Sequence, residues 1–132
     1  MRRERVVVYV TRGDQLLVFD HRDHPEAGTQ VPAGGVHEEE ALDDAAIREV
    51  FEETGVVLDG RPTFLGTHEH VDGLGRPARS SFVQIAAPST MPDSWQHQVT
   101  GSGDDQRLVF LCGFDSNPRL QDVQSLFWLK RL

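Results

Sequence analysis

The sequence predicts an α+β domain built on a mixed β-sheet, with one long helix placed between two groups of strands. Two short segments rich in Val, Leu and Phe stand near the N-terminus, an acidic run with helical periodicity follows, and more strand-like segments come after it. This order of elements is typical of a sheet covered by a helix. The 132 residues suit one domain, 1–132, of a size that buries its own core.

The N-terminal segments predict a β-hairpin. Residues 5–12 and 15–19 are apolar and rich in β-formers, and Gly13-Asp14 between them is a turn signal. The polar run HRDHPEAGT then predicts a loop, Gln30–Pro32 is predicted to be short and extended, and Gly34-Gly35 predicts irregular backbone.

A helix is predicted from Glu39 or Glu40 to Thr54. Leu42, Ala46 and Val50 recur at i+4 spacing and form its apolar face. Gly55 follows the last turn and is expected to cap the C-terminus.

The second half of the chain predicts three more strands, at 62–70, 79–86 and 107–114. The turn-rich VDGLGRP closes a hairpin between the first two. Residues 87–106 are polar, carry several helix and strand breakers, and are interpreted as a long loop. The tail, 120–132, favours a short helix over a strand.

The charge and composition exclude several classes of protein. The net charge is −8, with one lysine and scattered arginines, so binding to long nucleic acid or to an anionic membrane surface is not expected. No apolar run approaches the roughly 18 residues that span a bilayer, and the basic N-terminus reads as a first strand and not as a signal peptide. The single Cys112 lies in an apolar run and predicts a buried thiol, which fits a reducing, cytoplasmic location.

The stretch REVFEETG carries three glutamates that repel one another. Glu49, Glu52 and Glu53 are related as i, i+3 and i+4, so they share one face of the helix near its C-terminus. Like charges at this spacing and at this end of the helix dipole are both unfavourable. A solvated acidic face is one interpretation. The other is a site for a hard divalent cation, which prefers carboxylate oxygens.

The spacing of residues 34–56 favours the cation site. Written out, the segment is G-x5-E-x7-R-E-U-x-E-E-x-G-U, where U is an aliphatic residue. It resembles the Nudix box of the Nudix hydrolase family at every fixed position. The resemblance implies an α/β/α sandwich with a mixed sheet, in which the box forms a loop–helix–loop motif.

The resemblance also implies a reaction and a metal. Nudix hydrolases cleave the diphosphate linkage of a nucleoside diphosphate derivative or a related organic diphosphate, usually with Mg²⁺ and sometimes with Mn²⁺. By the family pattern the backbone carbonyl of Gly34 and the side chains of Glu49, Glu52 and Glu53 are metal ligands. Glu49 is a ligand or the general base, and water attacks phosphorus at the carboxylate-bound metal.

Four further residues receive roles from the same pattern. Arg48 is expected to orient a glutamate of the box, and Glu40 to anchor the loop or support the ligands. Many members take a further acid from outside the box, and Asp104 and Asp105 are the candidates here.

The loop before the helix departs from the commonest form of the motif. His37 and Glu39 stand where many members have Glu and Gly. Because the conformational freedom of glycine is lost at position 39, we expect the loop backbone to differ there.

The partner is expected to be a small-molecule diphosphate, and the sequence does not name it. Dimers are common in the family, so a homodimer is possible. Two alternatives stay open: a nucleotide-sensing Nudix module without catalysis, and a diphosphate isomerase-like enzyme that uses the same metal site.

Overall fold

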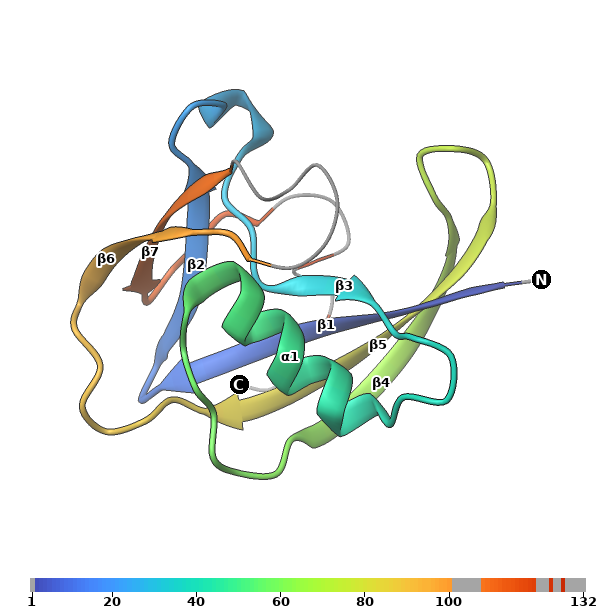
Figure 1. Ribbon diagram of the computed structural model, residues 1–132, viewed down its shortest axis with the longest axis horizontal. Helices are drawn as coiled ribbons and strands as arrows, with labels where there is room; N and C mark the ends of the chain where they lie inside the picture. Colours follow the sequence, from blue (N-terminus) through green and yellow to red (C-terminus); the bar gives the residue numbers. More distant parts are fainter. Residues whose placement is uncertain (1, 101–107, 121–123, 125–126, 128–132) are drawn as a thin grey trace.

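The computed structural model describes residues 2–100, 108–120, 124 and 127. Seven strands and one α-helix form from the described residues (Figure 1). They are β1 (Arg3–Arg12), β2 (Gln15–His21), β3 (Ala33–Gly35), α1 (Leu42–Thr54), β4 (Thr63–Val71), β5 (Pro77–Ala86), β6 (Ser94–Gln98) and β7 (Val109–Asp115), with a 3-10 turn at Pro25–Ala27.

The strands form one mixed sheet in the order β4-β5-β1-β2-β7-β6. Strand β1 pairs in parallel with β5, and the other pairings are antiparallel. The predicted hairpins β1–β2 and β4–β5 are both present. Beyond its short pairing with β2, β1 pairs with β3, so β3 forms the sheet edge beside the N-terminal half of β1.

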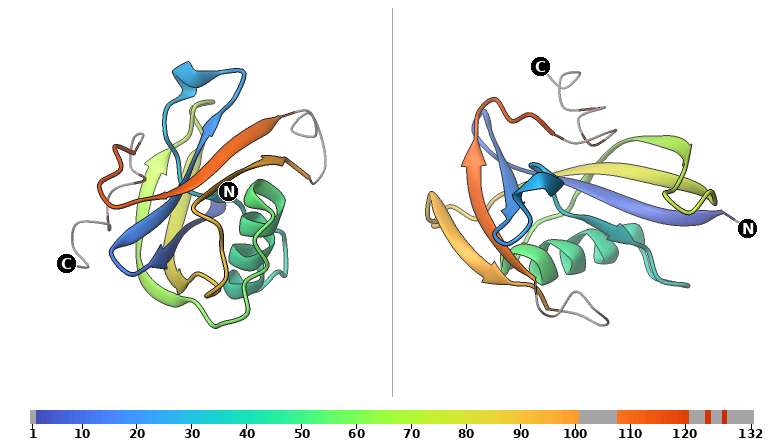
Figure 2. Two further views of the ribbon diagram at one scale, coloured as in Figure 1. Left: turned by 90° about the vertical axis from the view of Figure 1, so that its left-hand side faces the viewer. Right: turned by 90° about the horizontal axis from the view of Figure 1, so that it is seen from above.

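The sheet buries apolar side chains on both faces because successive residues of a strand point to opposite sides. On β1, Val6, Val8 and Val10 pack with Ala46 and Val50 of α1. Val7 and Tyr9 face the opposite side, with Phe82 and Val31. Helix α1 therefore covers one face of the sheet and lies across β1 (Figure 2).

Helix α1 has the predicted C-terminus and a later start. Gly55 is left-handed, with φ 79°, and its N–H donates to the Phe51 carbonyl at 2.9 Å. The helix begins at Leu42 and not at Glu39 or Glu40. Residue 39 has a positive φ, and Ala41 is extended as the N-cap, so neither continues a helix.

Two segments predicted to be irregular are strands. The Gly34-Gly35 prediction was wrong, because β3 pairs with β1 from Val7↔Ala33 to Arg5↔Gly35. The long loop predicted for residues 87–106 was wrong for Ser94–Gln98, which pairs with β7 as β6. Its residues alternate between exposed and partly buried, but glutamine and histidine hide that alternation from an apolar pattern.

Strand β6 holds the C-terminal turn of α1. The Trp95 indole N–H donates to the Thr54 carbonyl at 2.8 Å, and His97 Nε2 contacts the Glu52 carbonyl at 3.1 Å. The Thr100 N–H donates to the same Glu52 carbonyl at 3.0 Å. These bonds satisfy helix carbonyls that have no partner within the helix.

The tail predicted as a helix lies almost wholly outside the described residues. Within the described part of the chain, no helix has the length and apolar character needed to cross a bilayer.

We predict that Gly55→Ala destabilises the protein more than Gly13→Ala. Both glycines have positive φ, so an alanine costs about 1–2 kcal/mol of backbone strain at either position. A Cβ at Gly55 would also lie 2.8 Å from His97 Nδ1, whereas a Cβ at Gly13 meets nothing within 4 Å. Chemical denaturation measures the difference in the free energy of unfolding. Equal decreases in the two variants would show that the alanine at position 55 does not clash with His97.

Candidate functional site

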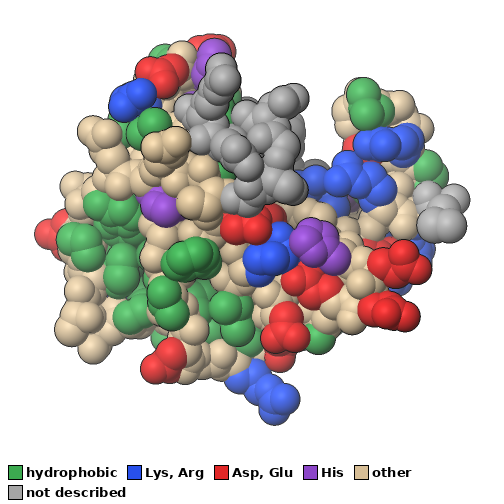
Figure 3. Space-filling view, viewed as in Figure 1, with side chains coloured by type: hydrophobic (Ala, Val, Ile, Leu, Met, Phe, Trp, Pro, Cys, Tyr) green, Lys and Arg blue, Asp and Glu red, His purple; other side chains and the backbone are tan. Residues whose placement is uncertain are grey.

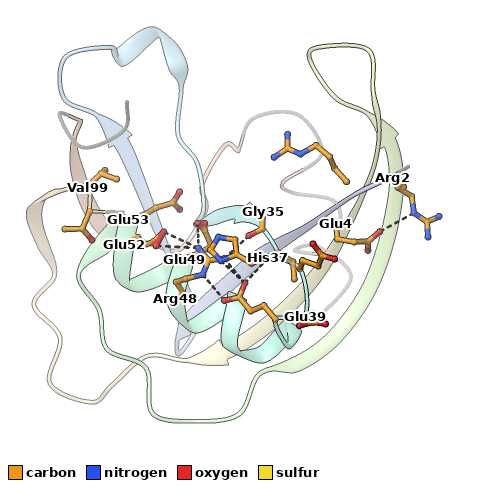
Figure 4. Close-up of a pocket in the computed structure, with 15 residues that line it drawn as sticks. Arg2, Glu4, Gly35, His37, Glu39, Arg48, Glu49, Glu52, Glu53 and Val99 are labelled. Carbon is orange, nitrogen blue, oxygen red and sulfur yellow. Dashed lines mark hydrogen bonds and ion pairs between the residues drawn. The ribbon is translucent and has the colours of Figure 1, made fainter. Parts of the chain in front are cut away.

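The acidic turn of α1 opens onto a cleft of about 920 Å³. The cleft lies between α1, the loop before it and the N-terminal end of β1, where charged side chains of both signs gather (Figure 3). Its charged lining residues are Arg2, Arg3, Glu4, Glu38, Glu39, Glu40, Arg48, Glu49, Glu52 and Glu53. The cleft thus brings together the three glutamates of the acidic turn and Arg48, which Figure 4 labels. Glu40 lines the same cleft.

Arg48 binds three carboxylates at once. Its Nε and Nη2 donate to the two carboxylate oxygens of Glu40, each at 2.9 Å. Its Nη1 lies 3.3 Å from Glu49 Oε1 and 3.2 Å from Glu52 Oε1. Nη2 also donates to the Gly35 carbonyl at 2.8 Å. One guanidinium therefore links α1, β3 and the loop between them.

Glu40 ties the loop to this arginine. Besides its two bonds to Arg48, Glu40 Oε1 accepts the His37 backbone N–H at 3.0 Å. The hydrogen bonds from Arg48 are the main cause that lowers the pKa of Glu40 to about 2. Glu40 is thus a charged anchor of the loop at neutral pH.

Glu39, the residue before this anchor, has a left-handed backbone with φ 64°. This is the conformation that glycine adopts at low cost and that other residues adopt at about 1–2 kcal/mol. The expectation that losing glycine would change the backbone here was wrong in this respect. The loop keeps a glycine-like conformation at a non-glycine residue, and strain of this kind persists where the surrounding contacts overdetermine the backbone.

Glu49 lies against Gly34. Glu49 is buried, and a Cβ added to Gly34 would overlap the Glu49 carboxylate. Only glycine leaves room for this contact. Burial is the main cause that raises the pKa of Glu49 to about 7, and the nearby charge of Glu52 acts in the same direction.

Glu53 contacts the outer edge of β3. Its Oε1 accepts the Ala33 backbone N–H at 3.0 Å. Burial, followed by repulsion from Glu49, raises the pKa of Glu53 well above its ordinary value. Both glutamates are therefore held where a negative charge is unfavourable, which is common at functional sites.

The pairing of β3 decides which backbone groups face this turn. The bonds Val8 N–H to Pro32 carbonyl and Val36 N–H to Glu4 carbonyl stand two residues to either side of the pair Val6↔Gly34. Antiparallel alternation then directs the polar groups of Gly34 toward β1 and those of Ala33 and Gly35 toward α1. The role of the Gly34 carbonyl as a metal ligand stays a prediction. The backbone groups of Ala33 and Gly35 were not predicted to face α1, because only the register of β3 on β1 shows their direction.

The glutamates do not converge on one point. Glu49 and Glu52 bind Arg48, and Glu53 binds the edge of β3. Accordingly, within the described part of the chain, no three His, Cys, Asp or Glu side chains form a group that could hold a metal ion.

Other candidates lie elsewhere or outside the described residues. Asp104 and Asp105 belong to 101–107, which the structure does not describe. His37 is exposed and lies 3.8 Å from Glu40. Cys112 is buried as predicted, and burial raises the pKa of its thiol to about 12, which disfavours a nucleophilic thiolate. His68 and His70 stack on each other on β4, away from α1.

Comparison with known proteins places the chain in a family. The sequence profile of the NUDIX domain matches residues 1–130. The chain belongs to the Nudix family. This confirms the identification made from residues 34–56, and family and fold together make the chain a Nudix-type hydrolase. No curated protein matches the sequence.

Solved structures of Nudix proteins share the fold. A MutT NUDIX hydrolase from Burkholderia pseudomallei is 20% identical with a TM-score of 0.75, over 100% of this chain and 99% of that one. A MutT structure from a study of Aliivibrio salmonicida and Vibrio cholerae is 16% identical, with a TM-score of 0.67 over 98% and 96%. A NUDIX hydrolase from Nitrosomonas europaea is 22% identical, with a TM-score of 0.58 over 70% and 64%. The predicted mixed sheet and Nudix-like fold are confirmed.

We predict that Glu39→Gly stabilises the protein. Glycine relieves the strain at φ 64° and removes one negative charge from the cleft, which together outweigh the entropy that glycine loses on folding. The expected gain is about 1 kcal/mol, or a few degrees in Tm. Glu38→Gly is the matched control, since it removes a negative charge from the adjacent residue, whose φ is not positive. If Glu39→Gly is no more stable than Glu38→Gly, the backbone at Glu39 is not strained.

Proposed function

We propose that this Nudix domain hydrolyses the diphosphate linkage of a nucleoside diphosphate derivative or a related organic diphosphate with a divalent metal ion. The observation that carries the proposal is the acidic turn itself. Glu49, Glu52 and Glu53 project from one turn of α1 into a cleft, and burial raises the pKa of two of them. A solvated acidic face would hold none of its carboxylates in this way.

The donor set fits Mg²⁺ or Mn²⁺. Nudix hydrolases generally use divalent metal ions, and hard cations of this kind prefer carboxylate and carbonyl oxygens. Glu49, Glu52 and Glu53 would hold the metal, with the Gly34 carbonyl as the remaining predicted ligand. When bound, the metal neutralises charge that develops on the phosphates and makes a bound water more acidic.

The protein's own residues supply position and proton transfer. Arg48 holds Glu49 and Glu52 beside each other, and Glu40 holds Arg48. Glu49 rests on Gly34 and has a pKa of about 7 in the metal-free chain, so it is a ligand or a base for the attacking water. Asp104 and Asp105 remain candidates for a further acid from the segment after β6.

The partner is a small molecule. The cleft of about 920 Å³ is of the size that proteins use for such ligands. A homodimer stays an expectation from the family, to be tested by light scattering.

A substrate panel tests the hydrolase. With Mg²⁺ or Mn²⁺, the protein is incubated with nucleotides, nucleotide sugars, dinucleoside polyphosphates and non-nucleotide diphosphates, and released phosphate and monophosphate are measured. We expect at least one class to be hydrolysed, and Glu53→Gln to reduce that rate by 100-fold or more, as loss of one transition-state contact of about 2.7–4 kcal/mol does elsewhere. No turnover above the Glu53→Gln level would end the hydrolase proposal. Tight nucleotide binding without turnover would indicate a sensor, and isomerised product an isomerase-like enzyme.

A thermal melt tests the metal site without turnover. We expect millimolar Mg²⁺ or Mn²⁺ to raise the Tm by several degrees, because a ligand at a hundred times its Kd adds about 2.7 kcal/mol. Glu52→Gln or Glu53→Gln should remove most of this gain. The control Glu38→Gln removes an exposed carboxylate of the same cleft and should keep it. Equal gains in all variants would show that the metal does not bind the acidic turn.

A further inference from the structure

Two side chains of β6 hold the last turn of α1 by its backbone. The strand alternates between exposed and partly buried residues, and the two partly buried ones are Trp95 and His97. The Trp95 indole N–H binds the Thr54 carbonyl, and His97 Nε2 binds the Glu52 carbonyl. The two donors are two residues apart on the strand, and the two carbonyls are two residues apart on the helix. One of these carbonyls belongs to a glutamate of the acidic turn.

The surroundings of His97 fix the direction of its ring. Because a carbonyl oxygen only accepts hydrogen bonds, Nε2 carries the hydrogen and donates it to the Glu52 carbonyl at 3.1 Å. The other ring nitrogen lies toward Gly55, where an added Cβ would be 2.8 Å from Nδ1. The glycine that ends the helix therefore also leaves the space that the imidazole occupies.

Glu52 is held at its backbone and at its side chain. Its carbonyl accepts the His97 bond and the Thr100 N–H at 3.0 Å. Its Oε1 lies 3.2 Å from Arg48 Nη1. Glu52, Thr100 and Arg48 all line the cleft. His97 therefore acts directly on the backbone of a proposed metal ligand.

The bond also stands where the helix dipole opposes the acidic turn. The last carbonyls of a helix give its C-terminal end a negative partial charge, which is unfavourable for the carboxylates there. An N–H donated to one of these carbonyls offsets part of that charge. His97 supplies such a donor at the residue that carries one of the carboxylates. Without it, the backbone of Glu52 would be held less firmly and the potential around the acidic turn would be more negative.

We propose that His97 is a positioning residue for the metal site: its Nε2 hydrogen bond fixes the backbone of Glu52 and thereby sets the affinity of the acidic turn for Mg²⁺ or Mn²⁺. The inference rests on the proposed metal-dependent hydrolysis. It adds a residue outside 34–56 that acts on a metal ligand without being one.

The competing explanation is that His97 only satisfies a helix carbonyl, as Trp95 does. Both explanations predict that loss of the His97 bond lowers the Tm of the metal-free protein. They differ in the metal affinity, because only a positioning residue changes the Kd of the metal as well. Trp95 binds the carbonyl of Thr54, which is not a proposed ligand, so the two residues can be compared on one strand.

Mn²⁺ titration calorimetry tests the proposal, at a temperature well below the Tm of every variant. We expect His97→Asn to weaken the Kd of Mn²⁺ by about three- to tenfold, the equivalent of one hydrogen bond, because the shorter amide does not reach the Glu52 carbonyl. His97→Gln should recover most of the affinity, since its amide N–H extends about as far from the backbone as Nε2. If His97→Asn does not fold, His97→Leu takes its place, because it fills the space without a donor.

Trp95→Phe is the matched control. It removes the indole N–H from the Thr54 carbonyl and keeps an aromatic ring beside Phe114. We expect this variant to have a lower Tm and an unchanged Kd for Mn²⁺. A loss of stability alone, from the same strand and the same helical turn, is thereby separated from a loss of metal affinity.

Three outcomes would overturn the proposal: a His97→Asn protein with the wild-type Kd, a Trp95→Phe protein whose Kd weakens as much, or a His97→Gln protein that binds as weakly as His97→Asn. A wild type that binds no Mn²⁺ would remove the proposed metal site and this inference with it. Metal binding that depends on His97, without turnover of any substrate in the panel, would leave the inference standing and remove only the hydrolase.

Discussion

The repulsion among three carboxylates on one helical turn is the constraint that organises the site. Glu49, Glu52 and Glu53 stay together because other groups hold them: Arg48 binds two, and the edge of β3 binds the third. The arginine is itself fixed by Glu40 and by the Gly35 carbonyl. Remove this scaffold and the carboxylates separate into water. The loop, the arginine and β3 therefore all serve to keep negative charges in an unfavourable place.

The sheet supplies the second half of this arrangement. Strand β3 presents backbone groups to the carboxylates, and Arg3 at the start of β1 also lines the cleft. At the C-terminal end of α1, directly after the acidic turn, β6 binds the carbonyls of Glu52 and Thr54. The acidic turn is thus held by β3 at its side chains and by β6 at its backbone, so strands from both halves of the chain set the geometry of the site.

The sequence predicted the elements that depend on residues close together in the chain. The i+4 apolar spacing gave α1, Gly55 gave its end, and the spacing from Gly34 to Val56 gave the family. Strands β3 and β6 were missed because their own residues are mostly glycine or polar and so lack the apolar alternation of a typical strand.

The parallel pairing of β1 with β5 has a consequence for how the protein folds. The acidic turn is encoded within residues 34–56, yet β1, on which it rests, is completed by a strand some seventy residues further along the chain. Likewise β2 pairs with β7, close to the end of the described chain. Contacts this distant in sequence form slowly, because the chain loses the entropy of closing a long loop before the contacts can stabilise it. During synthesis residues 34–56 therefore leave the ribosome before β5 and β7, on whose pairing the sheet beneath the acidic turn depends.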